Sequence, residues 1–180
     1  MNKTLETILT RKSVRKFTDQ KVDKKTIELL LQAAMSAPSN VNKQPWEFVV
    51  IDDKAMLQRI ASMTLYAKMT ADAPVAILVC GNMEKTLYGE GKDFWVQDCS
   101  AASENILLAA HALGLGAVWT GVYPTPDRVR NVSRAAGIPT DCGIIPLSLI
   151  PIGYPADEES ESQEPKAFDP SIVHYNGYTK

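Results

Sequence analysis

The sequence predicts a domain of the α+β class, in which a small sheet is flanked by helices. Segments with the apolar spacing of helices alternate with short apolar runs typical of strands, but without the strict rhythm of βαβ units. In addition, the 180 residues are 45% hydrophobic and 22% charged, which is the composition of an ordinary globular protein. A chain of this length is expected to form a single domain over residues 1–180.

The elements are expected in the following order. A helix is predicted over 23–37, because Asp23 can cap its first turn and Pro38 follows its last residue. The longest helix is predicted over 93–113, where small and apolar residues recur every three or four positions and form a seam. Shorter helices are predicted over 53–62 and 126–135. Apolar runs predict strands over 47–51, 75–80, 117–120 and 144–152.

Three features near the C-terminus qualify this scheme. Pro146 lies inside the last strand, and proline cannot donate to a sheet, so an edge strand or a bulge is expected there. Residues 156–165 carry five acids and no base, and we interpret them as a solvated loop. The tail over 168–180 is apolar enough to pack on another surface; its apolar side chains include Ile172, Val173, Tyr175 and Tyr178.

Composition excludes several classes of protein. The formal net charge of −2 and the pI of about 5.7 argue against a globally basic nucleic-acid binder. The N-terminus lacks the apolar run of a signal peptide, and no stretch of 18 apolar residues predicts a membrane span. Three widely spaced cysteines and two histidines favour neither disulfides nor zinc, so free thiols in a reducing cytoplasm are expected. These residues are Cys80, Cys99, Cys142, His111 and His174, and both histidines are interpreted as structural.

The first candidate site is the basic segment 11–15. In an extended loop, Arg11, Ser13 and Arg15 would share one side, with Lys12 between them. Guanidinium groups and a hydroxyl suit a phosphate dianion, because paired charged hydrogen bonds are short and strong. A solvated basic loop is the alternative. A nucleic-acid contact is a further alternative, but Phe17 is the one aromatic residue near the segment.

The second and third candidates are loops next to predicted strands. Segment 38–46 holds polar amides and a hydroxyl between two prolines, which could recognise the edge of a heterocycle or form a turn-rich connector. Segment 114–121 is rich in glycine, which allows close backbone approach, and its Trp119 could line a cofactor or belong to the core. No GxGxxG, GxSxG, P-loop, HExxH or CxxC motif is present, so chemistry would have to come from a bound cofactor.

In this order, the three segments resemble the motifs of the FMN-dependent nitroreductase family, and the resemblance extends over the whole chain. The segment Gly153-Tyr154-Pro155 and residues 173–176 are similar to the family's closing region. The resemblance implies a nitroreductase-like fold with a small mixed or antiparallel sheet. It also implies an intertwined homodimer in which helix 93–113 forms the dimer core and tail 168–180 packs on the partner subunit.

The resemblance also assigns the site residues. The ribityl phosphate and the flavin edge would be bound by Arg11, Lys12, Ser13 and Arg15. The other subunit would supply Pro38, Ser39, Asn40 and Asn42. The isoalloxazine, with a backbone N–H near its N5, would be lined by Trp119, Thr120 and Gly121. Near the C-terminus the sequence departs from the family pattern: Lys166 is the candidate for a phosphate contact, while Ala167 stands where an arginine is common.

The implied function is an FMN-dependent oxidoreductase of the cytoplasm. Hydride would pass from NADH or NADPH through the flavin to a small-molecule acceptor, such as a nitro compound or a quinone, by a ping-pong mechanism. The flavin would carry the chemistry, so no side-chain acid or base is expected. One alternative is a specialised flavin reaction, dehalogenation or flavin fragmentation, although 180 residues leave little room for the usual insertion. The other alternative is a non-catalytic flavin-binding module.

Overall fold

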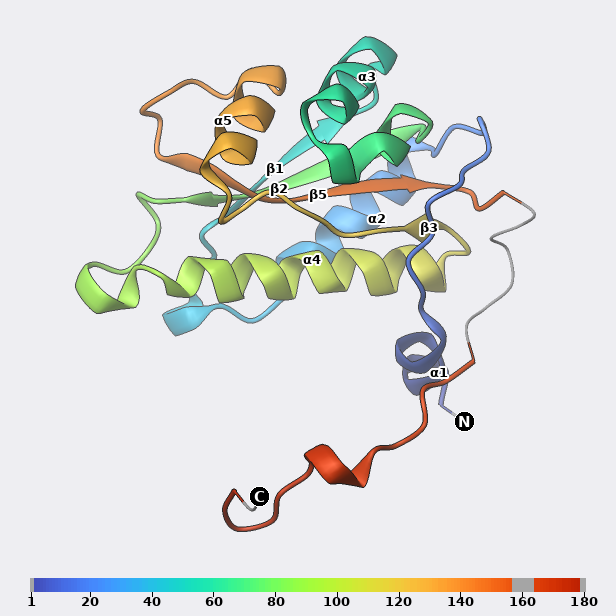
Figure 1. Cartoon of the computed structure of the whole chain (residues 1–180), viewed down its shortest axis with the longest axis vertical. Coiled ribbons are helices and arrows are strands. Elements are labelled where there is room, and N and C mark those ends of the chain that lie inside the picture. Colours follow the sequence, from blue (N-terminus) through green and yellow to red (C-terminus); the bar gives the residue numbers. More distant parts are fainter. Residues whose placement is uncertain (1, 157–163, 179–180) are drawn as a thin grey trace.

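A five-stranded antiparallel sheet separates two layers of helices (Figure 1). The structure is a computed structural model that describes residues 2–156 and 164–178. The strand order is β1-β2-β5-β3, and β4 also pairs with β5. The strands are β1 (Trp46–Ile51), β2 (Val75–Asn82), β3 (Gly116–Ala117), β4 (Thr120–Gly121) and β5 (Ile144–Gly153). The α+β class is therefore confirmed, and the sheet is antiparallel throughout its named pairings.

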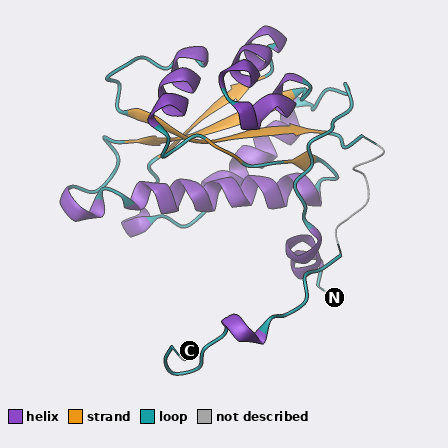
Figure 2. Ribbon diagram, viewed as in Figure 1, coloured by secondary structure: helices purple, strands orange, loops and turns teal. Residues whose placement is uncertain are grey.

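Each face of the sheet carries its own helices (Figure 2). Each face also has its own core of buried apolar side chains. One face is covered by α2 (Lys24–Met35) and α4 (Phe94–Ala112). The other face is covered by α3 (Lys54–Met63), α5 (Pro126–Ala135) and a 3-10 segment over Leu65–Ala71. A further helix, α1 (Lys3–Thr10), contacts α4. Among the described residues, no helix is both long and apolar enough to cross a bilayer.

The predicted helices form where their caps indicate. The Asp23 carboxylate accepts a hydrogen bond from the Thr26 amide at 3.0 Å, and Asp53 does the same for Met56 at 2.8 Å. Each cap satisfies an amide that has no partner inside its helix, so the start of the helix is determined locally.

The spacing predicts a seam along α4 made of Trp95, Cys99, Ala102, Ile106, Ala109 and Leu113, and the first four of these positions are buried as expected. Trp95, Cys99, Ala102 and Ile106 are buried in the core beneath the sheet, but Leu113 is 44% exposed. The buried face continues through Ala110 instead, because a helix with 3.6 residues per turn drifts away from a seam spaced at 3.5. These buried positions pack within their own subunit, so any dimer contact of α4 must use its outer face.

The expectation at Pro146 is half right. The edge-strand alternative is wrong, because β5 lies between β2 on one side and β3 with β4 on the other. The bulge alternative is confirmed: Val79 faces Ser148 while Cys80 faces Pro146, so Leu147 is an extra residue on β5. The bulge accommodates a proline inside a paired strand.

The strand predicted over 117–120 is divided into β3 and β4. Both follow one register along β5, with Ala117 opposite Ile152 and Thr120 opposite Leu149. Between them, the Val118 amide donates to the Pro151 carbonyl at 3.4 Å. Pro151 has no N–H to return the bond, and this missing donor interrupts the ladder.

The C-terminal segment runs away from the sheet as an extended arm (Figure 1). Four large side chains of this arm are at least 75% exposed, namely Phe168, Ile172, Tyr175 and Tyr178. The arm therefore does not bury them against its own subunit, and its packing on a partner stays a prediction. Most of the predicted acidic loop 156–165 lies outside the described residues.

Candidate functional site

The structure brings the first and third motifs side by side at one edge of the sheet. Ser13 forms a parallel bridge with Ala117, and the Val14 amide donates to the Ala117 carbonyl at 3.0 Å. The approach is close: a Cβ atom at Gly116 would lie 2.5 Å from Cγ1 of Val14. Glycine at this position therefore permits the contact between the two motifs.

The cations of the first motif collect at this edge. Arg15 is exposed, and its Nη1 lies 3.4 Å from the Ser13 carbonyl oxygen, to which it donates. Arg11 is half-buried, with its Nε 3.6 Å from Oε1 of Glu104 on α4. Lys12 and Ser13 are also half-buried. Two guanidinium groups beside a hydroxyl form a suitable receptor for a phosphate group.

In the third motif, the Thr120 side chain bonds to the neighbouring strand, whereas the backbone of Gly121 points away from that strand. The Thr120 hydroxyl donates to the Leu149 carbonyl at 2.7 Å, so this side chain is committed to the sheet. The Gly121 carbonyl instead accepts a hydrogen bond from Nη1 of Arg128 at 3.3 Å.

In an antiparallel strand, the N–H and C=O of one residue point to the same side. The Gly121 amide therefore faces away from β5, and a Cβ atom at Gly121 would meet nothing within 4 Å. Trp119 is half-buried, and its side chain packs against the core on the α4 side of the sheet.

The second motif lies at the opposite end of α4. The Asn40 amide donates to Oδ1 of Asp98 at 2.8 Å. A cavity of about 300 Å³ separates Pro38 and Ser39 from the outer face of α4, where Phe94 and Gln97 line it.

Within one chain the first and second motifs are held apart by α4. The first motif contacts Glu104, and Thr10 just before it bonds to His111, whereas the second motif contacts Asp98. At 1.5 Å per residue, these anchor points are separated by roughly 9–20 Å along the helix. A single chain therefore does not join the two motifs through these contacts. Two copies could join them if their α4 helices ran in opposite directions.

Lys166, the predicted C-terminal phosphate contact, is exposed at the start of the arm. In the described part of the chain, no hydrogen bond or ion pair joins it to the first motif. A contact with a ligand would require the arm to be positioned by something else.

Sequence reasoning missed Asp98. Its side chain is 6% exposed, and burial raises the pKa of its carboxyl group. Asp98 lies beside Cys99 but outside the predicted seam, so the periodicity of the longest helix did not single it out. By contrast, the structural interpretation of His111 agrees with its contact: Nε2 lies 2.9 Å from the Thr10 hydroxyl, while burial and Arg11 lower its pKa.

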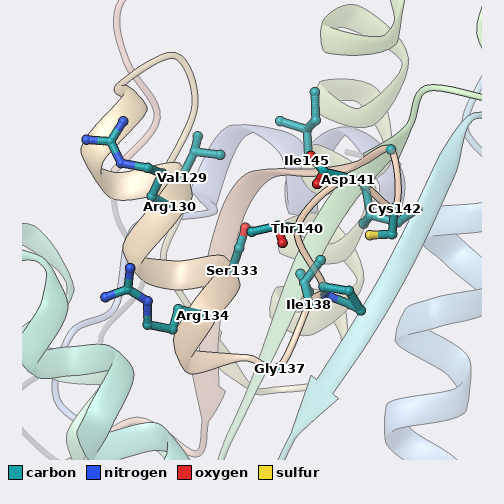
Figure 3. A pocket seen from close by; sticks show the side chains of 13 residues that line it. Val129, Arg130, Ser133, Arg134, Gly137, Ile138, Thr140, Asp141, Cys142 and Ile145 are labelled. Carbon is teal, nitrogen blue, oxygen red and sulfur yellow. The ribbon is translucent and has the colours of Figure 1, made fainter.

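The three cysteines are free thiols, as expected. Burial raises the pKa of Cys80 and of Cys99 to about 12, so both stay protonated at neutral pH. Cys142 is half-buried and lines a separate cavity of about 600 Å³ between α5 and the start of β5 (Figure 3). None of the predicted site residues lines this cavity.

Comparison with known proteins identifies the family of the chain. The model of the nitroreductase family matches residues 8–65 and 58–154. A protein of Methanothermobacter thermautotrophicus with the provisional name NADH dehydrogenase/NAD(P)H nitroreductase is 49% identical over 172 residues, covering 94% of this chain and 85% of the relative.

Two solved structures extend the comparison. A crystal structure from Parabacteroides distasonis, provisionally given the same name, superposes with a TM-score of 0.88 at 44% identity, covering 99% of this chain and 100% of that one. A provisionally assigned nitroreductase of Desulfovibrio desulfuricans, solved in complex with FMN, has a TM-score of 0.79 at 33% identity and 99% coverage of both chains.

The fold is of the α+β class, with an antiparallel sheet between two layers of helices and the first and third motifs in contact at one edge of the sheet. More particularly, the chain belongs to the nitroreductase family.

Proposed function

We propose that this protein is an FMN-dependent oxidoreductase that takes hydride from NADH or NADPH and reduces nitro compounds, quinones or similar small acceptors. The single observation that carries the proposal is the contact between the first and third motifs. Ser13 and Val14 contact Ala117, which lies four residues before the open backbone of Gly121 on the same extended segment. Cations at one end of this segment and an unobstructed, outward-facing amide at the other suit the two ends of a flavin mononucleotide.

The residues present fit this cofactor. The first motif offers two guanidinium groups and a hydroxyl to the phosphate, and Lys12 adds positive charge near the flavin edge. The Gly121 amide can donate to a ring nitrogen, and the absence of a side chain there leaves room for the ring. Lys166 is the further candidate for the phosphate if the arm reaches it.

A second copy of the chain completes the proposed site. Pro38, Ser39, Asn40 and Asn42 lie at the far end of α4 from the first motif, so we assign them to the partner's flavin. The exposed apolar arm would then cover the neighbouring subunit, which accounts for its exposed aromatic side chains. The functional unit in this proposal is an intertwined homodimer with two equivalent sites.

Bound FMN would accept hydride from the nicotinamide and donate it to the acceptor in two separate half-reactions, which is ping-pong kinetics. The chain's own residues bind and orient. The cations of the first motif favour a negatively charged ligand at the sheet edge, and the packed strands hold the Gly121 amide in place. This division of tasks requires no acid or base from the protein at the reacting atoms.

Purified protein reconstituted with FMN tests the proposal. We expect a yellow dimer that bleaches with NADH or NADPH and regains its colour with a nitroarene or a quinone. Initial rates at several acceptor concentrations should give parallel double-reciprocal lines. A colourless monomer that takes up no FMN would contradict the proposal. A yellow protein that no nicotinamide reduces would support the non-catalytic flavin module instead.

We also infer that the protein works in the cytoplasm and that its partners are small molecules and its own copy. Three free thiols suit a reducing compartment, and pyridine nucleotides supply the electrons there. We expect no binding to nucleic acid. If the protein bound a DNA oligonucleotide with an affinity that fell steeply with salt, this expectation would be wrong.

A further inference from the structure

The turn that presents the second motif is strained. Val41, Asn42 and Gln44 have φ angles of 49°, 54° and 48°, in the left-handed region that side chains rarely adopt. Asparagine tolerates this region, but Val41 is β-branched and Gln44 precedes a proline, and both properties oppose it. Strain of this kind persists only where surrounding contacts enforce it, and it concentrates at functional sites.

Hydrogen bonds inside the turn hold its local shape. The Gln44 amide donates to the Ser39 hydroxyl at 2.9 Å, and the Gln44 side chain donates to Oδ1 of Asn42 at 3.1 Å. The Asn42 amide donates to the Ser39 carbonyl at 3.0 Å. These bonds move with the turn, so they do not determine where the turn lies relative to the rest of the molecule.

Asp98 supplies a side-chain link from the turn to α4, besides the backbone bond from the Asn82 amide to the Pro45 carbonyl at 2.6 Å at the end of the turn. Oδ1 of Asp98 accepts from the Asn40 amide at 2.8 Å, and α4, on which Asp98 stands, packs along the sheet. A buried carboxylate is costly, yet a charged acceptor makes a stronger bond to an amide than a neutral one. Two titratable groups lie near Asp98. Lys43 lines the same small cavity, and Cys99, whose thiol is buried, follows Asp98 on α4.

We propose that Asp98 is a positioning residue for the flavin site: its carboxylate anchors the Asn40 amide to α4 and so places the strained turn 39–44 where Ser39, Asn40 and Asn42 meet the cofactor. Asp98 itself touches no ligand in this account. The inference deepens the proposed function and rests on it, because the turn is assigned to the partner subunit's flavin.

Three variants of the full-length dimer test the proposal. Asp98→Ala removes the acceptor, Asp98→Asn keeps an oxygen in place without the charge, and Thr86→Val is the matched control. Thr86 is buried in the same small cavity, but its hydroxyl bonds to the Met83 carbonyl at 2.9 Å and not to the turn. FMN affinity is measured by titration of the flavin-free protein, and hydrogen exchange of the Asn40 amide reports on the anchor directly.

We expect Asp98→Ala to weaken FMN binding by roughly tenfold to a hundredfold, which corresponds to the loss of one hydrogen bond to a charged group. Asp98→Asn should restore most of the affinity, and Thr86→Val should match the wild type. In the flavin-free protein, Asn40 should exchange faster in Asp98→Ala than in either other variant. If Asp98→Ala is too unstable to purify, Asp98→Leu removes the same acceptor while filling the space.

Two outcomes would overturn the inference, and they can be told apart. If the wild type binds FMN and Asp98→Ala or Asp98→Leu binds it equally well, Asp98 does not position the site, although the proposed function stands. If the asparagine and alanine variants lose affinity equally, the acceptor is not what matters, and the anchoring role is wrong. A wild type that binds no FMN refutes the proposed function itself.

Discussion

At the scale of single residues, charged side chains define the site. Arg11 and Arg15 supply positive charge at the sheet edge, whereas Asp98 uses a buried negative charge to hold a backbone amide. The sequence made the first two candidates for anion binding, because arginines spaced around a serine suit a phosphate, and this role stays a prediction. Asp98 could not be predicted, because its role depends on a turn that lies 58 positions away in the chain.

The Arg15 guanidinium is expected to contribute directly to flavin retention. Arg15→Ala should weaken FMN binding by about 1–3 kcal/mol, the value of a charge-assisted hydrogen bond. The measurement is flavin content after extensive dialysis, together with a dissociation constant from titration. Arg59→Ala is the control, because Arg59 is an exposed arginine on α3, remote from the first motif. Equal flavin content in the wild type and in Arg15→Ala would refute the assignment.

Asp98 also makes stability depend on pH. Burial raises its pKa in the folded state, so the folded protein holds this proton more tightly than the unfolded chain does. Below the ordinary pKa of 3.8, both states are protonated and the carboxyl group costs nothing. As the pH rises from there through the folded-state pKa, the unfolded state is favoured and stability falls.

Asp98→Asn removes this dependence while keeping an acceptor for Asn40. The free energy of unfolding of Asp98→Asn, relative to that of the wild type, should therefore increase as the pH rises from about 3.5 to 7. Urea unfolding at a series of pH values measures the difference. Thr86→Val should run parallel to the wild type at every pH. A constant gap between Asp98→Asn and the wild type would show that burial of the charge is not the cause.

At the scale of elements, local signals predicted the helices well and the sheet incompletely. Asp23 and Asp53 mark the starts of α2 and α3 because capping involves residues three positions apart. The position of β5 inside the sheet could not be predicted, since strand order depends on contacts between distant segments. Pro146 predicted an edge strand or a bulge without deciding between them, and the register shift at Leu147 shows that the bulge is the one that formed.

The contact between the first motif and β3 gives the element-scale prediction. Gly116→Ala would place a Cβ atom 2.5 Å from Cγ1 of Val14 and 2.6 Å from its Cβ, so the two segments must separate. We expect a loss of stability of about 1–3 kcal/mol, the usual cost of overpacking, together with weaker FMN binding. Thermal and urea unfolding measure the first effect, and flavin titration measures the second.

Gly121→Ala is the contrasting variant, because its added methyl group meets nothing in the chain. It should unfold like the wild type while binding FMN more weakly, since the space it fills is assigned to the flavin ring. A Gly116→Ala variant as stable as the wild type would show that the first motif does not depend on its approach to β3.

At the scale of the whole molecule, the single chain leaves apolar surface uncovered. Large side chains of the arm stay exposed, and a groove of about 460 Å³ between α1, α2 and α4 is open on the same side. The resemblance predicted a dimer, but composition and periodicity alone did not, because an exposed apolar arm shows only that something must cover it. The proposed second subunit would also explain why the first and second motifs lie at opposite ends of α4.

Removal of residues 164–180 tests the role of the arm. The truncated chain should keep its sheet and helices, because the arm makes little contact with them, but it should shift toward monomer and lose FMN. Sedimentation at several concentrations measures the first change and flavin content the second, with circular dichroism as the test of folding. Tyr88→Ala is the control, since Tyr88 is 95% exposed on the main body. A truncated chain that remains a yellow dimer would refute this role.

The different accessibilities of the three thiols allow the proposed dimer to be studied by labelling a single cysteine. Cys80 and Cys99 are inaccessible to reagents, whereas Cys142 opens into a cavity that none of the assigned flavin contacts lines. A nitroxide spin label would therefore attach once per subunit without occupying the flavin contacts. Pulsed electron resonance would measure the distance between two such labels in the proposed dimer and so report how its subunits are arranged in solution.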